Sequence, residues 1–248
     1  MDIVKNREAV NQLYLKGIHR IAEKEYAIAP NYFDFVKNVE SRRELFEQNG
    51  KNAGSITLNL NLSETQEIKQ KMIDMIFDSG LMKQVIETTG IPLYLTNFIH
   101  MITRAADDEL LWHRDIYYWK NSGPVGLMPA PYKLMVYNSE VTKSSEFEVL
   151  AGTHKIDFNS KLFDKFLTTI KYKSNIFRGK PGSAMIFHTS ALHRRRKPRA
   201  GFAPRSATVF GLAPTPWQQE LYLPKHATEI KRYNEHLNEL KKEISWLP

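Results

Sequence analysis

The spacing of apolar residues predicts helices toward both ends of the chain. Residues 5–25 and 64–89 each carry an apolar stripe at helical spacing, and Ser79-Gly80 is the expected break in the second segment. Near the C-terminus the stripe consists of Ile230, Tyr233, Leu237, Leu240 and Ile244. Such a stripe is typical of a helix that packs on its own domain, and we expect that packing here rather than a partner-binding zipper.

From Ile91 onward the pattern changes to runs of β-branched and aromatic residues, which favour strands. The expected strands cover residues 91–104, 132–141, 146–152, 174–179, 183–193 and 206–214, with one helix at 161–170. Helices followed by a run of strands and a last helix indicate the α+β class, with the strands in a sandwich or barrel. Because no repeat or Gly/Ser linker interrupts the chain, we expect a single domain over residues 1–248. Its parts are a mainly helical flank at 1–90, a strand core at 91–214 and a C-terminal helix at 215–248.

Composition is that of an ordinary globular protein, with 42% hydrophobic and 25% charged residues. The absence of cysteine excludes disulfides, thiolate metal sites and cysteine nucleophiles. The N-terminal sequence MDIVKNREAV lacks the apolar run of a signal peptide. No segment approaches the roughly 20 apolar residues of a membrane helix. We therefore expect a cytoplasmic protein with no membrane span, and the net charge of +8 favours acidic partners.

The run LLWHRDIYYW, residues 110–119, places charged side chains among residues that favour burial. Charged groups are costly to bury unless they are paired or hold a metal. Residues two apart in an extended segment project to the same side, so His113 and Asp115 can bind one ion. A third ligand would complete the two-histidine, one-carboxylate triad that leaves positions open on iron(II). A His–Asp hydrogen bond on a loop, with no ion, is the alternative reading of the same spacing.

A second run, SAMIFHTSALHRRR, supplies the candidate third ligand. His188 and His193 are five apart and would point to opposite faces of a regular strand. His193 ends that strand, where a ligand can face into the mouth of a barrel. Arg205 then opens the next expected strand, and an arginine there can hold a carboxylate through two hydrogen bonds.

These segments together resemble the phytanoyl-CoA dioxygenase (PhyH)-like family of Fe(II)/2-oxoglutarate-dependent oxygenases. The resemblance spans residues 92–214 and rests on LWHRD, EVLAGTHK at 148–155, PGSAMIFHTSALH at 181–193, and Arg205-Ser206. It implies a double-stranded β-helix (jelly roll) core between the flanking helices. It also implies that His113, Asp115 and His193 bind iron and that Arg205 binds the distal carboxylate of 2-oxoglutarate, with O2 as the oxidant.

The resemblance further implies a dioxygenase that hydroxylates an unactivated C–H bond of a small metabolite. Related halogenases replace the carboxylate of H-x-D by a small residue, so Asp115 favours hydroxylation. The stretch HRRRKPRAGFAPR, residues 193–205, carries six Lys/Arg and no acid, which indicates an anionic substrate. Two alternatives stay open: a nucleic-acid-directed oxygenase of the same fold, and a non-catalytic jelly-roll binding protein. The sequence indicates neither the oligomeric state nor whether hydroxylation, desaturation or cyclisation occurs.

The chain departs from the family pattern at two places. Arg195 stands two residues after the distal histidine, where the family often has a small polar residue. Either the co-substrate is held differently, or Arg194, Arg195 and Arg196 face another anion or form a solvated loop. Ser183 stands where the family has an aspartate, a change to which we assign no catalytic contact.

Other residues near the candidate site have two readings each. Asn97 is expected on the strand face toward 2-oxoglutarate, although a hydrogen bond within the core is equally compatible with the pattern, and His100 is expected to point the other way. The segment Tyr117–Trp119 would line a substrate pocket or belong to the core. Gly152-Thr153-His154 is expected to form a turn with positive φ at the glycine.

Overall fold

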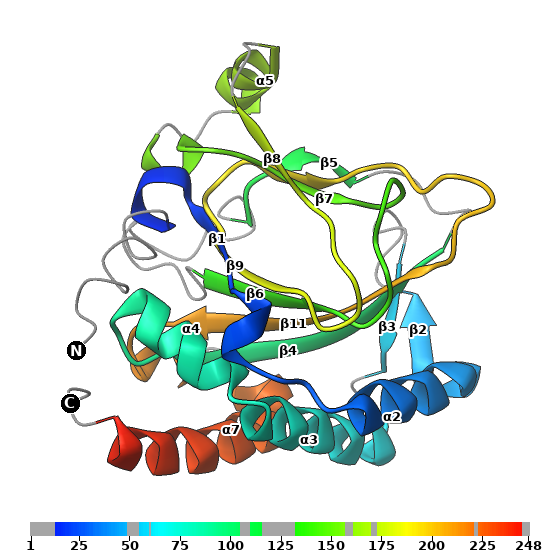
Figure 1. Ribbon diagram of the computed structural model, residues 1–248, viewed down its shortest axis with the longest axis vertical. Coiled ribbons are helices and arrows are strands. Elements are labelled where there is room, and N and C mark those ends of the chain that lie inside the picture. The colour runs from blue at the N-terminus through cyan, green and yellow to red at the C-terminus, as the bar shows by residue number, and fades with distance from the viewer. Residues whose placement is uncertain are drawn as a thin grey trace.

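Two antiparallel sheets face each other in the computed structural model, and helices cover the outer face of the larger sheet (Figure 1). The structure describes residues 13–48, 55–59, 61–104, 110–115, 132–156, 161–169, 173–220 and 223–244. The larger sheet has the order β1-β9-β6-β11-β4-β3-β2 and the smaller has the order β5-β10-β7-β8. This arrangement is a jelly roll of the α+β class, as predicted.

The strands of the larger sheet are β1 (Ile18–Arg20), β2 (Phe46–Gln48), β3 (Ile56–Leu58), β4 (Tyr94–Thr103), β6 (Tyr132–Tyr137), β9 (Ala184–His188) and β11 (Arg205–Ala213). Those of the smaller sheet are β5 (Leu110–His113), β7 (Phe147–Leu150), β8 (Ser174–Phe177) and β10 (His193–Arg195). The α-helices are α2 (Pro30–Ser41), α3 (Ser63–Asp78), α4 (Leu81–Thr89), α5 (Lys161–Thr169), α6 (Trp217–Glu220) and α7 (Leu223–Glu243). Short 3-10 helices cover Glu23–Glu25, Arg43–Leu45 and Thr153–Lys155.

Alternation along the central strands sends one set of side chains to each core. On β6, Met135 and Tyr137 belong to the cluster between the sheets, whereas Leu134 and Val136 join the cluster beneath the helices. Successive strand residues point to opposite faces, so the larger sheet is apolar on both sides. An inward polar residue on these strands therefore lies inside the barrel.

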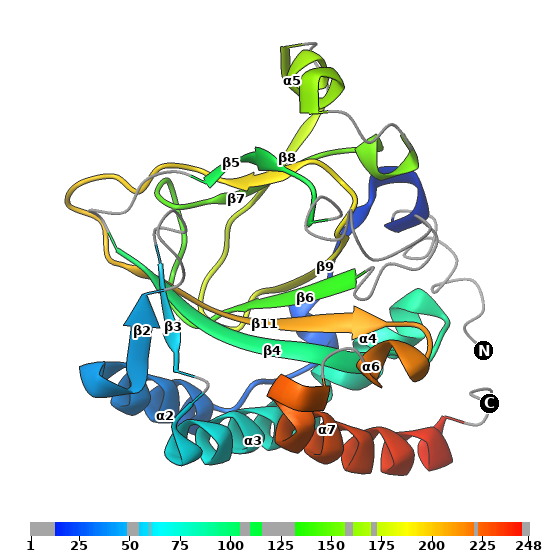
Figure 2. The same ribbon diagram turned by 180° about the vertical axis from the view of Figure 1, so that it is seen from behind.

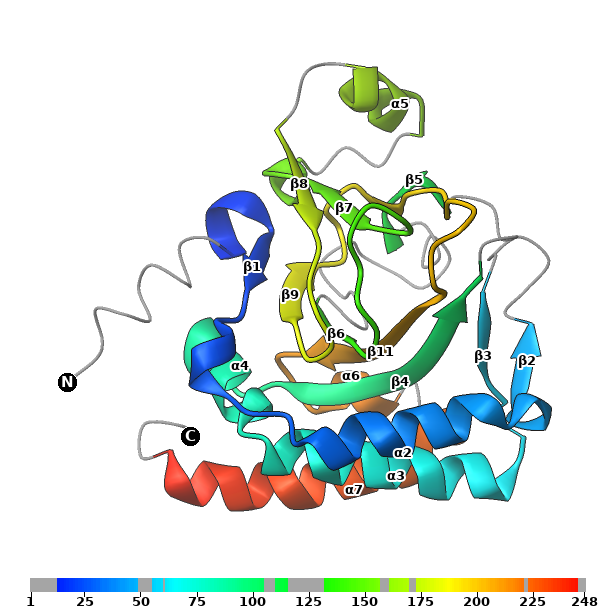
Figure 3. The ribbon, with the colours of Figure 1, turned by 45° about the vertical axis from the view of Figure 1, so that its right-hand side comes forward.

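The helices α2, α3 and α7 lie side by side against the outer face of the larger sheet (Figures 2 and 3). The predicted apolar stripe of α7 is buried there, and the Tyr233 hydroxyl donates to the Leu93 carbonyl at 3.0 Å. Lys69 of α3 and Glu229 of α7 form a buried ion pair at 3.3 Å. The prediction that the C-terminal helix packs on the fold is confirmed. None of the described helices is long and apolar enough to cross a bilayer.

The prediction of a helix over residues 5–25 is wrong in its second half; residues 1–12 lie outside the described part. Gly17, at φ +73°, ends a short helical turn, and Ile18 then pairs with Phe187 as part of β1. Together with β2 and β3, this strand extends the larger sheet into the expected helical flank. Three-residue strands carry too few positions for an alternation to be recognised. The break predicted between the helices α3 and α4 is confirmed, with Gly80 at φ +77°.

The expected strand over residues 183–193 divides into two. β9 ends at His188, and a turn at Thr189–Leu192 carries the chain across to β10 in the other sheet. A hydrogen bond from the Ala191 amide to the His188 carbonyl, at 2.9 Å, closes the turn. This crossing places His193 opposite His113 of β5.

Candidate metal centre

His113, Asp115 and His193 come together where β5 pairs with β10. One ligand atom from each lies within 4.8 Å of the others. Asp115 Oδ1 is 3.8 Å from His113 Nε2 and 3.7 Å from His193 Nε2. The two imidazole rings have centroids 4.3 Å apart. Within the described part of the chain, this is the group of histidine and carboxylate side chains that can hold a metal ion.

Backbone hydrogen bonds orient both imidazoles toward the carboxylate. His113 Nδ1 lies 2.7 Å from the Leu111 carbonyl and His193 Nδ1 lies 2.8 Å from the Ala191 carbonyl. A carbonyl accepts only from a protonated nitrogen, so each neutral ring carries its hydrogen on Nδ1. The lone pairs of both Nε2 atoms are then available to a metal.

The protonation states of the three side chains suit metal binding. Burial lowers the pKa of His113, and burial together with the neighbouring His113 ring lowers the pKa of His193 to about 3. Burial alone would raise the pKa of Asp115, but the Lys133 ammonium and the two imidazoles bring it to about 2. At neutral pH the group therefore offers two neutral imidazoles and one carboxylate, the protonation states that bind a divalent metal.

Lys133 of β6 contacts this group and was not predicted from the sequence. Its Nζ lies 2.8 Å from Asp115 Oδ2. The signal was present in the alternation of β6, because Lys133 shares the inward face of Met135 and Tyr137.

Arg114, the middle residue of H-R-D, fixes the motif from behind. Its guanidinium is buried, with Nε 3.0 Å from Asp164 Oδ1 and Nη1 donating to the carbonyls of Thr153 and Ser190. These contacts join β5 to α5, to the turn after β7 and to the turn after β9. Arg114, the charged residue within the apolar run, therefore forms a buried ion pair that links these segments next to the candidate ligands His113 and Asp115.

Arg205 is a buried guanidinium in the same barrel interior. Nη1 donates to the Ser145 carbonyl at 3.0 Å, and Nη2 lies 3.7 Å from Met101 Sδ. Burial lowers the pKa of Arg205, and the nearby Tyr137 hydroxyl opposes that shift. Its Nε is buried without a hydrogen-bond partner, and no carboxylate in the described part of the chain pairs with it. The residue therefore suits an anionic ligand, because a buried cation without a counter-charge is costly.

The three consecutive arginines after His193 face two ways. Arg195 points into the barrel, where it is buried and its Nη1 lies 3.2 Å from Thr103 Oγ1. Thr103 is also the register partner of Arg205, so both guanidinium-bearing residues belong to the same end of the barrel.

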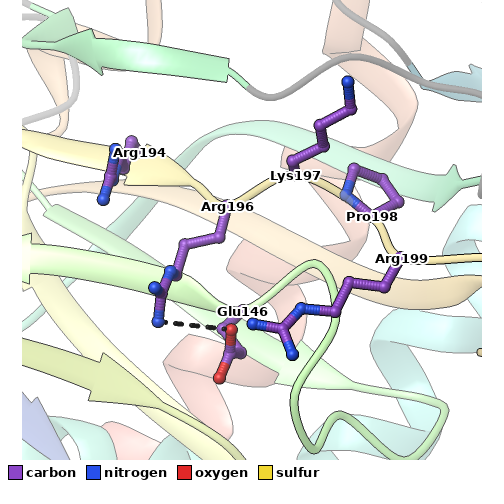
Figure 4. Close-up of a pocket in the computed structure, with 6 residues that line it drawn as sticks. All are labelled: Glu146, Arg194, Arg196, Lys197, Pro198 and Arg199. Atoms are coloured by element: carbon purple, nitrogen blue, oxygen red, sulfur yellow. Dashed lines mark ion pairs between the residues drawn. The ribbon is translucent and has the colours of Figure 1, made fainter.

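Arg194 lies on the outer face of the smaller sheet with Arg196, because its register partner Glu148 stands between the inward Phe147 and Val149. Figure 4 shows Arg196 turned toward Glu146. Arg194 Nε is 2.7 Å from Glu148 Oε2, and Arg196 Nη1 is 3.6 Å from Glu146 Oε2. They line a surface cleft of about 320 Å³ with Lys197. The hint of an anionic substrate drawn from this basic stretch is therefore not supported by Arg194 and Arg196, because both are ion-paired away from the barrel.

The remaining sequence expectations divide as follows. Asn97 faces the barrel and its side chain covers Gly211, with a buried Oδ1 that has no hydrogen-bond partner among the described residues. His100 points to the opposite face, as predicted. Its Nε2 lies there 3.1 Å from Glu40 Oε1. Gly152 has φ +80°, which confirms the expected turn. Tyr117, Tyr118 and Trp119 lie outside the described residues.

No family model matches the sequence, and a search of curated proteins finds no match either. Solved structures do share the fold. The non-heme α-ketoglutarate-dependent carbocyclase SnoK of nogalamycin biosynthesis is 12% identical, with a TM-score of 0.62 over 83% of each chain. EctD from S. alaskensis, solved with 2-oxoglutarate and 5-hydroxyectoine, is 14% identical, with a TM-score of 0.58 over 86% of this chain and 82% of its own.

HygX from Streptomyces hygroscopicus, solved with nickel and 2-oxoglutarate, is 15% identical, with a TM-score of 0.60 over 84% of this chain and 87% of its own. At these identities the likeness establishes the fold alone. The chain has the jelly-roll fold that these three enzymes share.

Proposed function

We propose that the chain is an Fe(II)/2-oxoglutarate-dependent oxygenase of the PhyH-like family. The observation that carries the proposal is the convergence of His113, Asp115 and His193 in a barrel that also holds Arg205, whose guanidinium has no carboxylate partner among the described residues. Two neutral imidazoles and one carboxylate are the donor set typical of iron(II) sites with open positions. A buried arginine without a counter-charge suits a dicarboxylate co-substrate.

Each residue has a defined part in this function. His113, Asp115 and His193 would hold iron(II), and Arg205 would bind the distal carboxylate of 2-oxoglutarate. When bound, iron(II) and 2-oxoglutarate would supply, together with O2, the oxidation of an unactivated C–H bond. The rings of Phe147 and Phe187, with centroids 5.4 and 5.2 Å from that of His193, limit the access of water to the site.

The proposed substrate is a small, anionic metabolite, and the proposed reaction is hydroxylation. Arg195, which points into the barrel, supports an anionic substrate, in place of the outward Arg194 and Arg196. The carboxylate of Asp115 supports hydroxylation over halogenation. Cyclisation is the competing outcome, since the similar fold of SnoK is that of a carbocyclase.

Succinate release tests the reaction class. The protein with Fe(II), ascorbate and 2-oxoglutarate should form succinate, faster with a true substrate than without, and Asp115→Ala should abolish this turnover. Tight binding of metal and 2-oxoglutarate with no turnover in any mixture would instead support a non-catalytic binding protein.

Co-substrate binding tests Arg205 separately. Arg205→Met should weaken 2-oxoglutarate binding to the Mn(II)-loaded protein by about 10- to 100-fold, because a hydrogen bond to a charged group contributes roughly 1.5–3 kcal/mol. Arg205→Lys is the matched control that retains the charge without the planar fork. If calorimetry gave the same 2-oxoglutarate affinity for Arg205→Met as for wild type, the assignment of Arg205 would be contradicted.

A further inference from the structure

The two oxygens of Asp115 face different partners. Oδ1 is the oxygen that lies between the imidazoles, 3.8 and 3.7 Å from their Nε2 atoms. Oδ2 is held by the Lys133 ammonium at 2.8 Å. The carboxylate is therefore oriented with one oxygen toward the metal-binding nitrogens and the other toward a cation of the protein itself.

The sheet fixes the lysine in this place. Lys133 is paired in register with Gly211 on one side and with Phe187 on the other, and all three belong to the inward row of the larger sheet. Gly211 carries no side chain, and the Asn97 side chain covers it instead. The side chain of Lys133 is only 22% exposed. Its neighbours on the barrel wall therefore restrict the direction from which its ammonium reaches Asp115.

A carboxylate can bind a metal through one oxygen or through both. Three single-atom ligands leave three of six octahedral positions open, and a second carboxylate oxygen would fill one of them. We propose that Lys133 is a positioning residue that retains Oδ2, so that Asp115 ligates the metal through Oδ1 alone. This inference rests on the proposed function, because it assumes that the three side chains bind a divalent metal.

If Lys133 acted on the metal only through the repulsion between the two positive charges, its removal would give a different result. An ammonium close to a divalent cation repels it, so loss of that repulsion alone would strengthen metal binding and leave the number of bound waters unchanged. Positioning of Asp115 instead predicts a change in that number. The two effects are separated by a measurement of metal-bound water rather than of affinity or activity.

Water-proton relaxation by bound Mn(II) provides this measurement, because it scales with the number of waters on the metal. Lys133→Met removes the ammonium with little change of volume, which frees Oδ2 to displace one of three waters. We expect the relaxation enhancement per bound Mn(II) to fall by about one third. Lys180→Met is the control, since Lys180 lies in an exposed ion pair with Glu23.

Chemical rescue identifies the ammonium as the cause. The chain has no cysteine, so Lys133→Cys creates a single thiol that 2-bromoethylamine converts into a lysine analogue. The aminoethylated protein should regain the wild-type relaxation, whereas the neutral adduct of iodoacetamide should not.

Equal relaxation in Lys133→Met and wild type would overturn the proposal. A loss of Mn(II) binding that aminoethylation fails to restore would overturn it as well, because it would indicate a collapsed pocket. Absence of Mn(II) binding to the wild-type protein would contradict the proposed function itself.

Discussion

At the scale of single residues, the buried pair of Arg114 and Asp164 should be a large contributor to stability. Arg114→Met would leave the Asp164 carboxylate buried without its partner and would remove the donor to two backbone carbonyls. Breaking a buried ion pair on one side costs roughly 3–5 kcal/mol. We expect a loss of this order in the free energy of unfolding, measured by urea denaturation.

The double variant Arg114→Met/Asp164→Leu is the control for this prediction. It removes both charges and should recover part of the loss, since an apolar pair leaves no uncompensated charge. A double variant that is less stable than Arg114→Met would show that the two side chains do not act as a pair.

Individual residues also show how much of the site could be predicted from the sequence. His113 and Asp115 could be paired from their spacing, because residues two apart in a strand share a face. Lys133 and Arg114 could not be assigned partners, since their contacts join segments far apart in the chain. An inward position follows from alternation, but the residue that it meets follows only from the way the sheets close.

At the scale of elements, the turn between β9 and β10 should be sensitive to acid. His188 Nδ1 accepts hydrogen bonds from the Ser190 hydroxyl at 2.6 Å and from the Ser190 amide at 3.3 Å, which requires the neutral ring. Burial and the nearby His154 lower the pKa of His188 to about 4. The unfolded chain, with an ordinary histidine pKa near 6.5, takes up this proton first, so stability falls as the pH drops from about 6.5 toward 4.

His188→Asn tests this, because its side-chain oxygen can accept from Ser190 without titrating. In metal-free protein, the variant should match wild type near pH 7.5. Below pH 6.5 its unfolding free energy should decline less steeply, by up to about 1.4 kcal/mol per pH unit. His113 and His193 titrate in both proteins and cancel in the comparison. Identical slopes in urea titrations at several pH values would refute the role of His188.

The same turn shows why element boundaries were harder to predict than element types. Residues 183–193 read as one apolar strand, yet the chain changes sheets after His188 because Arg114 and Thr153 bind the turn. Those contacts join segments far apart in the chain, so they cannot be recognised from the spacing of apolar residues in this segment. The long elements β4, β11, α3 and α7 were predicted because each repeats its pattern over many residues.

At the scale of the whole molecule, the order of helices and strands was enough to predict the class and the layered architecture. The larger sheet is buried on both faces, by α2, α3 and α7 on one side and by the smaller sheet on the other. The short strands β1, β2 and β3 were missed because they gain their stability from pairing with β9 and β4 rather than from their own sequence.

The candidate ligands lie on the smaller sheet, so metal binding should stabilise the entire fold. His113 and His193 belong to two adjacent strands, and Asp115 is joined to β6 of the larger sheet through Lys133. A metal that binds only the folded chain adds about 2.7 kcal/mol at a free concentration of 100 times its Kd. We expect Mn(II) to raise the melting temperature of the wild-type protein, and a chelator to reverse the rise. Asp115→Ala should show no such shift, because two imidazoles alone hold the ion weakly. An equal shift in both proteins would place the metal elsewhere on the molecule.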